Sequence, residues 1–189
     1  MTREEGYKIL TSLIKSPNLI KHHLAAEAAM IGIAKHLKKT HSDINIDDWG
    51  LVGLLHDADY EETKNIPEKH ALLVAEKIGD KVKPEILYAI KSHGYSVNGV
   101  EPKSLMDWAI YTCDELTGFI IACALIKPEK KLSGVDINFV LNRMKEPGFA
   151  RAVDRNQIKM CEEKLGIPIP EFIDLTLKSM QAISKDLGL

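Results

Sequence analysis

Apolar residues along this chain recur at spacings of three and four positions, which is the period of a helix with one buried face. No stretch alternates apolar and polar residues in the manner of a half-buried strand. The pattern therefore predicts an all-α protein, a single-domain helical bundle of about eight or nine helices.

Residues suited to helix ends mark where the first two helices should begin. Thr2 followed by Glu5 has the form of a capping box, in which each side chain bonds the other residue's backbone N–H. Ser16 and Pro17 supply an N-cap and a first-turn proline for a second helix, which we expect to run to about Lys39.

The middle of the chain carries similar signals. Asp47 is expected to cap a third helix, whose apolar residues lead into His56 near its C-terminal end. Ser104 with Asp107 forms another capping box and should open a long helix reaching about Ile126.

Prolines and glycines divide the remaining sequence. Pro67 and Pro84 suit the first turns of two further helices, which would carry His70 and His93. The segments with helical period beyond Pro128 are Asp136–Lys145, Phe149–Leu165 and Pro170–Leu187. We expect residues 1–189 to form one domain, with helices 136–187 packed on a core of about residues 17–126.

Composition narrows the class of protein. The chain has 189 residues, of which 45% are hydrophobic, and 25 Lys+Arg against 27 Asp+Glu give a formal net charge of -2. A chain of this length can bury a sizeable core, but this balance provides no broad basic field for a nucleic-acid backbone. We therefore expect no stable nucleic-acid partner.

Targeting and membrane signals are not evident. The start, MTREEGYKIL, is charged, and the most apolar stretch, Ala109–Ile126, is interrupted by Asp114 and Glu115. The three cysteines form no CxxC pair and are odd in number, as in a reduced protein. These features predict a cytoplasmic protein without a membrane partner.

The feature that calls for chemistry is Leu54-Leu55-His56-Asp57, where an apolar helical stretch ends in an imidazole and a carboxylate. Alone, such a pair is more often a cap or a hydrogen-bonded pair than a ligand set. The sequence, however, places further inward-facing polar residues beside apolar ones, and buried ionisable groups need a partner or a metal. These residues are His22, His70, His93 and Asp114.

Four imidazoles and two carboxylates suit one or two divalent ions of hard or borderline character, namely Mn, Fe, Co, Ni, Zn or Mg. Adjacent helix residues point about 100° apart, so His56 and Asp57 share one ion only where the helix ends. This geometry favours Asp57 as a bridge between two ions.

The order His22, His56-Asp57, Asp114 resembles the H…HD…D signature of the HD-domain superfamily of metal-dependent phosphohydrolases. Similarity to small HDIG-type hydrolases extends through LIKHHLAAEAAM, LLHDADYE, KHALLVAE, AIKSHGYS and CDELTGFI, over about residues 17 to 160. Two departures are Asp59 in place of the glycine of HDIG, and a doubled first histidine. We assign the first position to His22, with His23 as the alternative.

The resemblance implies a ligand set and a reaction. His22, His56, Asp57 and Asp114 would hold one ion, and Asp57, His70 and His93 a second. His56 and Asp57 would form the catalytic centre, where a metal-activated hydroxide cleaves a phosphate ester of a small molecule or nucleotide. We expect the protein to bind this small phosphorylated substrate and to exist as a monomer or as a homodimer.

A basic segment follows the predicted metal helices and resembles the FAxxVxR segment of the same hydrolases. Such a charge run is usually a solvated face, but it also offers phosphate-binding side chains. These candidates are Arg143, Lys145, Arg151 and Arg155. Glu61 and Glu62 are candidates for a proton donor or for exposed surface, and Gly118 is expected to permit close helix packing.

Two other functions fit the same residues. One is a di-iron oxygenase built on the same His/Asp scaffold, since some dinuclear HD proteins resemble such enzymes. The other is a non-catalytic sensor module in which the metal is structural. A site with every coordination position filled by protein would favour the sensor, because hydrolysis needs an open position for water.

Overall fold

The computed structural model describes residues 1–189 and contains helices and no strands. Nine of its α-helices have seven or more residues. Their bounds are α1 Arg3–Leu13, α2 Pro17–Leu37, α3 Ile46–Leu55, α5 Leu72–Ile78, α6 Pro84–His93, α8 Leu105–Leu125, α9 Ile137–Met144, α10 Arg155–Leu165 and α11 Ile169–Ala182. The all-α prediction is therefore confirmed.

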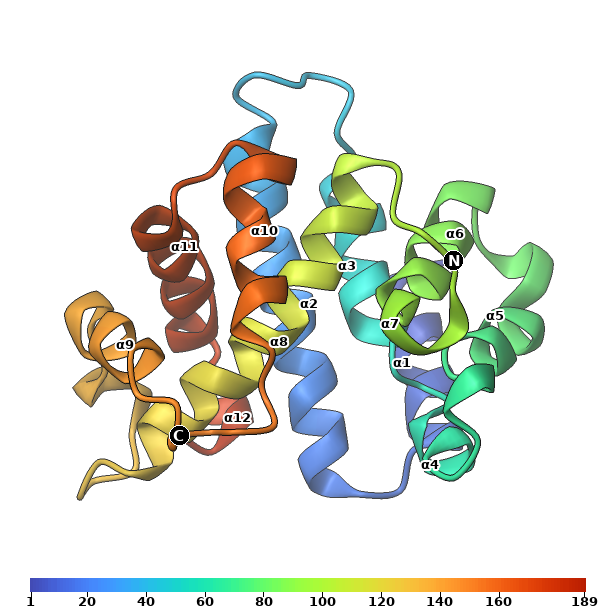
Figure 1. Cartoon of the computed structure of the whole chain (residues 1–189). Helices are drawn as coiled ribbons and strands as arrows, with labels where there is room; N and C mark the ends of the chain where they lie inside the picture. Colours follow the sequence, from blue (N-terminus) through green and yellow to red (C-terminus); the bar gives the residue numbers. More distant parts are fainter.

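Single-turn segments join several of these helices. They are α4 Tyr60–Thr63, α7 Tyr95–Asn98, α12 Ser184–Leu187 and three short 3₁₀ turns, η1 Pro67–Lys69, η2 Gly79–Lys81 and η3 Leu132–Gly134. The segments α4, η1 and α7 lie close to one another and form one end of the molecule with α5 and α6 (Figure 1).

The helix α8 crosses the middle of the protein and packs against α2, α6 and α10 (Figure 1). Of its apolar window, 61% is buried within the protein, although its length and composition alone would allow it to cross a membrane. Such burial is compatible with a core helix of a soluble protein. The C-terminal helices α10 and α11 pack on α8 and α2.

Local cap chemistry sets most helix starts. Thr2 and Glu5 form the predicted capping box of α1, and Ser104 and Asp107 form that of α8. The prediction for α3 was wrong in its cap, because Asn45 accepts from the N–H groups of Asp47 and Asp48.

Two other predicted elements differ from the observed ones. Pro67 opens only the 3₁₀ turn η1, so His70 lies between η1 and α5 rather than on a helix. The expected helix from Phe149 begins later, at Arg155, where Asp154 caps α10 through the N–H groups of Asn156 and Gln157. In both places the chain forms a loop that packs against other helices instead of continuing its local period.

Candidate metal centre

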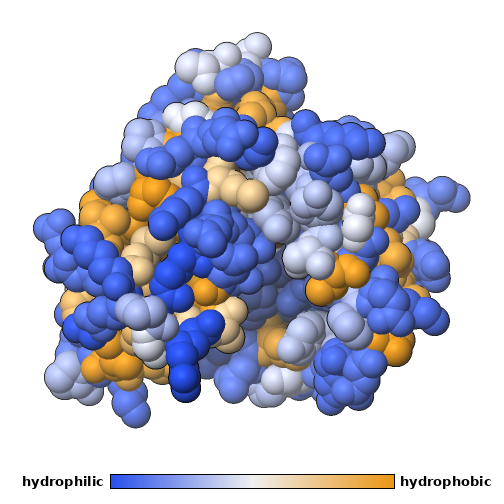
Figure 2. All heavy atoms as spheres, in the orientation of Figure 1, coloured by the Kyte–Doolittle hydropathy of each residue, from blue (hydrophilic) through white to orange (hydrophobic).

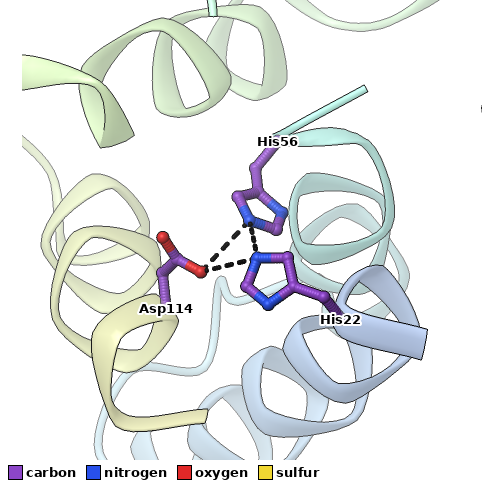
Figure 3. A group of neighbouring side chains, drawn as sticks. All are labelled: His22, His56 and Asp114. Carbon is purple, nitrogen blue, oxygen red and sulfur yellow. Dashed lines mark hydrogen bonds and ion pairs between the residues drawn. The ribbon is translucent and has the colours of Figure 1, made fainter. Parts of the chain in front are cut away.

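Three helices bring a first ligand group together, consisting of His22, His56 and Asp114 (Figure 3). His22 lies on α2, His56 is the C-cap of α3, and Asp114 lies in the middle of α8. The two Nε2 atoms are 3.1 Å apart, and Asp114 Oδ1 lies 3.0 Å from His22 Nε2 and 3.2 Å from His56 Nε2. Residues separated by up to 92 positions thus converge on one point.

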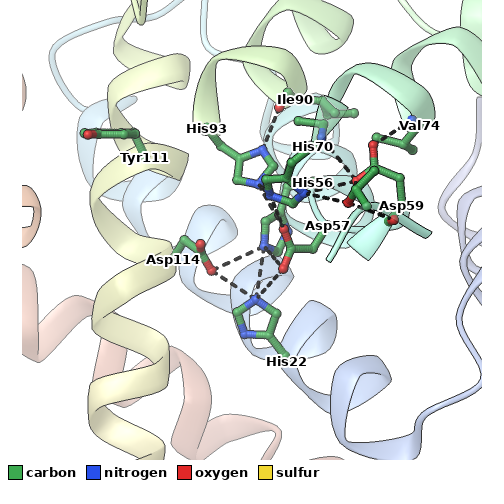
Figure 4. Close-up of polar contacts among 12 residues, drawn as sticks. His22, His56, Asp57, Asp59, His70, Val74, Ile90, His93, Tyr111 and Asp114 are labelled. Atoms are coloured by element: carbon green, nitrogen blue, oxygen red, sulfur yellow. Dashed lines mark hydrogen bonds and ion pairs between the residues drawn. The ribbon is translucent and has the colours of Figure 1, made fainter. Parts of the chain in front are cut away.

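A second ligand group adjoins the first and consists of Asp57, His70 and His93 (Figure 4). His70 Nε2 and His93 Nε2 are 3.0 Å apart. Asp57 Oδ1 lies 3.0 Å from His70 Nε2 and 2.9 Å from His93 Nε2. His56, Asp57 and His93 also offer ligand atoms within 4.8 Å of one another, so the two groups are contiguous.

The carboxylate of Asp57 lies between the two groups. Its Oδ1 faces His70 and His93, whereas its Oδ2 lies 3.5 Å from His22 Nε2 and 3.9 Å from His56 Nε2. One oxygen is therefore directed to each group, which is the arrangement that a bridging ligand requires.

Backbone carbonyls orient two of the imidazoles. His56 Nδ1 donates to Gly53 O at 2.9 Å, and His93 Nδ1 donates to Ile90 O at 2.6 Å. A histidine whose Nδ1 carries the proton presents the lone pair of Nε2, which is the form that binds a metal. Both Nε2 atoms point into the cluster.

One ligand atom of the first group has no hydrogen-bond partner within the protein. Asp114 Oδ1 is buried and accepts no well-aligned hydrogen bond, although two imidazole nitrogens lie within 3.2 Å of it. Ligand atoms about 2.1 Å from an ion lie about 3.0 Å apart at right angles and about 3.4 Å apart at tetrahedral angles. The distances of 2.9–3.2 Å within each group are short enough for its three ligand atoms to hold one ion in common.

Water has access to one side of the cluster. The side chains of His22 and Asp114 are each 22% exposed and that of His70 is 16% exposed, whereas His56 is completely buried. Figure 2 shows a hollow with hydrophilic walls near the centre of the face that α8 crosses. His56 thus lies on the buried side of the cluster, and His22, Asp114 and His70 lie on its partly exposed side.

The surrounding imidazoles lower the pKa of both carboxylates in the cluster. Burial would raise the pKa of Asp57, but the charge of His56 and hydrogen bonds from His22, His70 and His93 hold it well below its usual value. Burial also acts to raise the pKa of Asp114. The charges of His56 and His22 have the larger effect, and the pKa of Asp114 is lowered. Both carboxylates are therefore ionised and available as ligands.

The imidazoles respond in the opposite direction. Burial would lower the pKa of His70, but its bonds to Asp57 and Asp59 raise the pKa to about 10. The pKa of His22 is also raised, because Asp114 and Asp57 outweigh the effect of burial. Metal ligation requires neutral imidazoles, so binding of an ion would release these protons.

The neighbouring His23 has a different environment. It is fully buried, its two ring nitrogens have no hydrogen-bond partner, and burial holds its pKa well below the usual range. The His23 ring packs beside the His56 ring, with centroids 5.2 Å apart, and belongs to neither ligand group. Of the two adjacent histidines, His22 is the one that the fold directs into the cluster.

Glu115 is a half-buried carboxylate that sequence reasoning did not single out. It follows Asp114 on α8 and accepts a hydrogen bond from the N–H of Asp154 at 3.0 Å. Burial, together with the charge of Asp114, raises its pKa to about 7. The only sequence signal was its place directly after a predicted ligand.

The four basic candidates do not form one anion site. The Arg155 guanidinium is surrounded by backbone carbonyls of residues 144–153 and lies over the Phe119 ring. Arg143 pairs with Glu146 at 2.7 Å. Lys145 and Arg151 are exposed. Arg155 therefore organises a loop, and Lys145 and Arg151 are the two whose charged ends face solvent.

Two acidic residues beyond the cluster have structural partners. Glu61 accepts from the N–H groups of Lys15 and Ser16 and so stabilises the start of α2, where the Ser16 side chain makes no capping bond. Glu62 pairs with Lys77 on the surface. The expectation for Gly118 was wrong, because nothing lies within 4 Å of the position of its missing Cβ.

Comparison with known proteins gave no family assignment. No protein-family model matches the chain, and neither curated proteins nor solved structures gave a significant match. The functional argument therefore depends on the residues and their geometry.

Proposed function

We propose that this protein is a metal-dependent phosphohydrolase of the HD-domain type, which cleaves a phosphate ester of a small molecule or nucleotide. One observation carries the proposal: two groups, each of two imidazoles and one carboxylate, share the Asp57 carboxylate at their junction. The ordered signature from His22 to Asp114 supports the same class.

The donor set favours an ion that prefers nitrogen and oxygen ligands. His22, His56 and Asp114 would hold one ion and His70 and His93 the other, with Asp57 between them. Such ions, when bound, lower the pKa of water towards neutrality and neutralise phosphoryl oxygens. Imidazole and carboxylate ligands of this kind suit Mn, Fe, Co, Ni, Zn or Mg.

The side chains divide the remaining work. Asp57 would fix the separation of the two ions. The buried rings of His56 and His93 contact the Asp57 carboxylate and would hold it in place. The exposed edges of His22 and Asp114 leave room at the rim for a phosphoryl group. Lys145 and Arg151 are the basic candidates retained for binding the rest of the substrate.

The oxygenase alternative has one observation in its favour. Two histidines and one carboxylate on adjacent positions, with the opposite side open, are also the ligand pattern of non-haem iron oxygenases. Each ligand group here has that composition. The sensor alternative is less favoured, because the partial exposure of His22 and Asp114 would let water reach a bound ion.

Phosphate release distinguishes these functions. Protein loaded with Mn²⁺, Co²⁺ or Ni²⁺ should release phosphate from some member of a panel of nucleotides and phosphomonoesters, and chelator-treated protein should not. Asp57→Ala should lose metal binding and hydrolysis together, while Glu76→Gln, an exposed acidic control on α5, should keep both.

The outcomes are separable. Full hydrolysis by Asp57→Ala would exclude the proposed mechanism. Iron-dependent oxygen uptake without phosphate release would favour the oxygenase, and tight metal binding with neither activity would favour the sensor. A cytoplasmic location, a homodimer, and the lack of nucleic-acid and membrane partners stay predictions.

A further inference from the structure

His70 is the cluster imidazole with the least regular support. His22 lies within α2, His56 caps α3 and His93 is the last residue of α6, whereas His70 lies between η1 and α5 with φ -57° and ψ 137°. The next residue, Ala71, has φ 64°, a left-handed conformation that is unfavourable for a residue with a side chain. Contacts from elsewhere must therefore hold this turn.

Asp59 supplies these contacts and is completely buried. Its Oδ1 accepts from Ala71 N at 3.1 Å and lies 3.2 Å from His70 Nδ1, and its Oδ2 accepts from Val74 N at 2.9 Å. Thr63 Oγ1 lies 3.4 Å from the same carboxylate and 3.3 Å from His70 Nδ1. One carboxylate thus caps α5, holds the left-handed turn and orients the ring (Figure 4).

Asn98 fixes the other side of the same turn. Its Nδ2 donates to His70 O at 2.9 Å and to Lys91 O at 2.8 Å. Lys91 lies two residues before His93 on α6. The amide therefore ties the backbone of His70 to the helix that carries the other histidine of the second ligand group.

We propose that Asp59 and Asn98 are positioning residues that assemble the second metal site by holding His70 against Asp57 and His93. This inference rests on the proposed dinuclear function. Asp59 connects the turn to the segment that carries Asp57, and Asn98 connects it to the helix of His93. The site is thus made from three pieces of chain joined by two polar side chains.

We call the contacts of Asp59 and Asn98 with the turn at His70 the frame of the second site. The first ligand group needs no such frame. His56 is oriented by Gly53 O of its own helix, and His22 and Asp114 project from the interiors of two long helices. Neither Asp59 nor Asn98 has a hydrogen bond to a residue of that group. Loss of the frame should therefore empty the second site and leave the first.

The chemistry of Asp59 makes an isosteric test possible. All of its partners are hydrogen-bond donors, namely two backbone N–H groups, a hydroxyl and the Nδ1–H of His70. An amide would turn a donor towards one of these donors and would accept more weakly from the ring. Asp59→Asn keeps the size of the side chain but removes this orientation of His70.

Titration with Mn²⁺, followed by electron paramagnetic resonance and by metal analysis, tests the frame. Wild-type protein should bind two ions and give the signal of a spin-coupled pair. Asp59→Asn and Asn98→Ala should bind the first ion within about threefold of the wild-type affinity and the second about 10- to 100-fold more weakly, with a mononuclear signal. The control, Glu76→Gln, changes an exposed acidic side chain on α5 and should behave as wild type.

Backbone strain offers a rescue. Adding Ala71→Gly to Asp59→Asn relieves the left-handed turn and should restore part of the second-ion affinity, because glycine adopts positive φ freely. Circular dichroism and thermal unfolding identify a variant that does not fold, and Asn98→Ala then carries the test.

Three results would overturn the inference, and they differ from one another. Two-ion binding of wild-type strength in both Asp59→Asn and Asn98→Ala would remove the frame and leave the dinuclear proposal intact. Equal weakening of both ions would assign the two residues to general stability. A wild-type protein that binds a single ion would overturn both the frame and the dinuclear function.

Discussion

Gly53 of α3 faces the backbone of Ala26 in α2 so closely that a Cβ at Gly53 would lie 2.5 Å from Ala26 O. The same Cβ would lie 2.7 Å from Glu27 Cα. The carbonyl of Gly53 also accepts the hydrogen bond from His56 Nδ1 at 2.9 Å. The close approach of the helices that carry His22 and His56 therefore depends on a missing side chain.

Substitution of Gly53 by alanine should separate these helices. The added methyl group meets backbone rather than a flexible side chain, so we expect Gly53→Ala to lower the free energy of unfolding by about 1–3 kcal/mol. It should also weaken binding of the first ion, because His22 and His56 no longer meet at 3.1 Å. Denaturant unfolding and Mn²⁺ titration measure the two effects.

Gly118→Ala is the matched control on α8. Its added Cβ meets nothing within 4 Å, and alanine is favoured over glycine inside a helix by about 1 kcal/mol. We expect equal or higher stability and unchanged metal affinity. Equal destabilisation by the two substitutions would contradict the role given to Gly53.

Helix starts were predictable where residues within one helical turn determine them. The capping boxes at Thr2 and Ser104 need only residues three apart, and both formed as expected. His70 was misplaced because its turn is held by Asp59 and Asn98, which lie 11 residues before and 28 residues after it in sequence. A periodic pattern carries no information about such contacts.

The candidate ligands were identified because each interrupts an apolar face. The residues that support them do not have this signal. Asp59 was noticed only as a departure from a motif, and Gly53 was not noticed, since its role depends on which helix lies opposite. Arg155 has the appearance of a phosphate ligand in sequence, and only the fold brings the carbonyls of residues 144–153 around it.

Metal binding should stabilise the folded protein. The ligands come from distant parts of the chain, so the unfolded chain has no comparable site. At an ion concentration of about 100 times Kd, one occupied site contributes about 2.7 kcal/mol, which for a chain of this size is a rise in Tm of about 5–11 °C.

Thermal unfolding with Mn²⁺ and then with excess chelator measures this shift. The rise should reverse with chelator and should be absent in Asp57→Ala. His36→Ala, which removes a histidine paired with Glu171 away from the cluster, should retain it. An unchanged Tm in wild-type protein at saturating Mn²⁺ would argue against a metal site at these residues.

The cysteines should be inert until the protein unfolds. Cys113, Cys123 and Cys161 are buried and free. Burial raises the pKa of Cys123 and of Cys161 to about 12, and raises that of Cys113 well above its usual value. Only the thiolate reacts, and at pH 8 a thiol of pKa about 12 has about one part in ten thousand in that form.

A thiol reagent such as DTNB at pH 8 should therefore detect almost no cysteine in the native protein and three equivalents in guanidinium chloride. Because the shifts are upward, reactivity should rise with pH while the fold persists. Rapid reaction of a single native thiol at pH 8 would show that at least one of the three side chains is accessible.

Arg155 and Arg151 should respond differently to substitution, although sequence alone groups them. Arg155→Met leaves carbonyls of residues 144–153 without their donor, and we expect a loss of about 1–3 kcal/mol in the free energy of unfolding. Arg151→Ala removes an exposed side chain, so stability should stay within about 0.5 kcal/mol while KM for the substrate rises. Denaturant unfolding and steady-state kinetics on both variants separate the two roles.

An unchanged KM in Arg151→Ala would leave Lys145 as the exposed basic candidate. An unchanged stability in Arg155→Met would mean that the loop keeps its shape without the guanidinium.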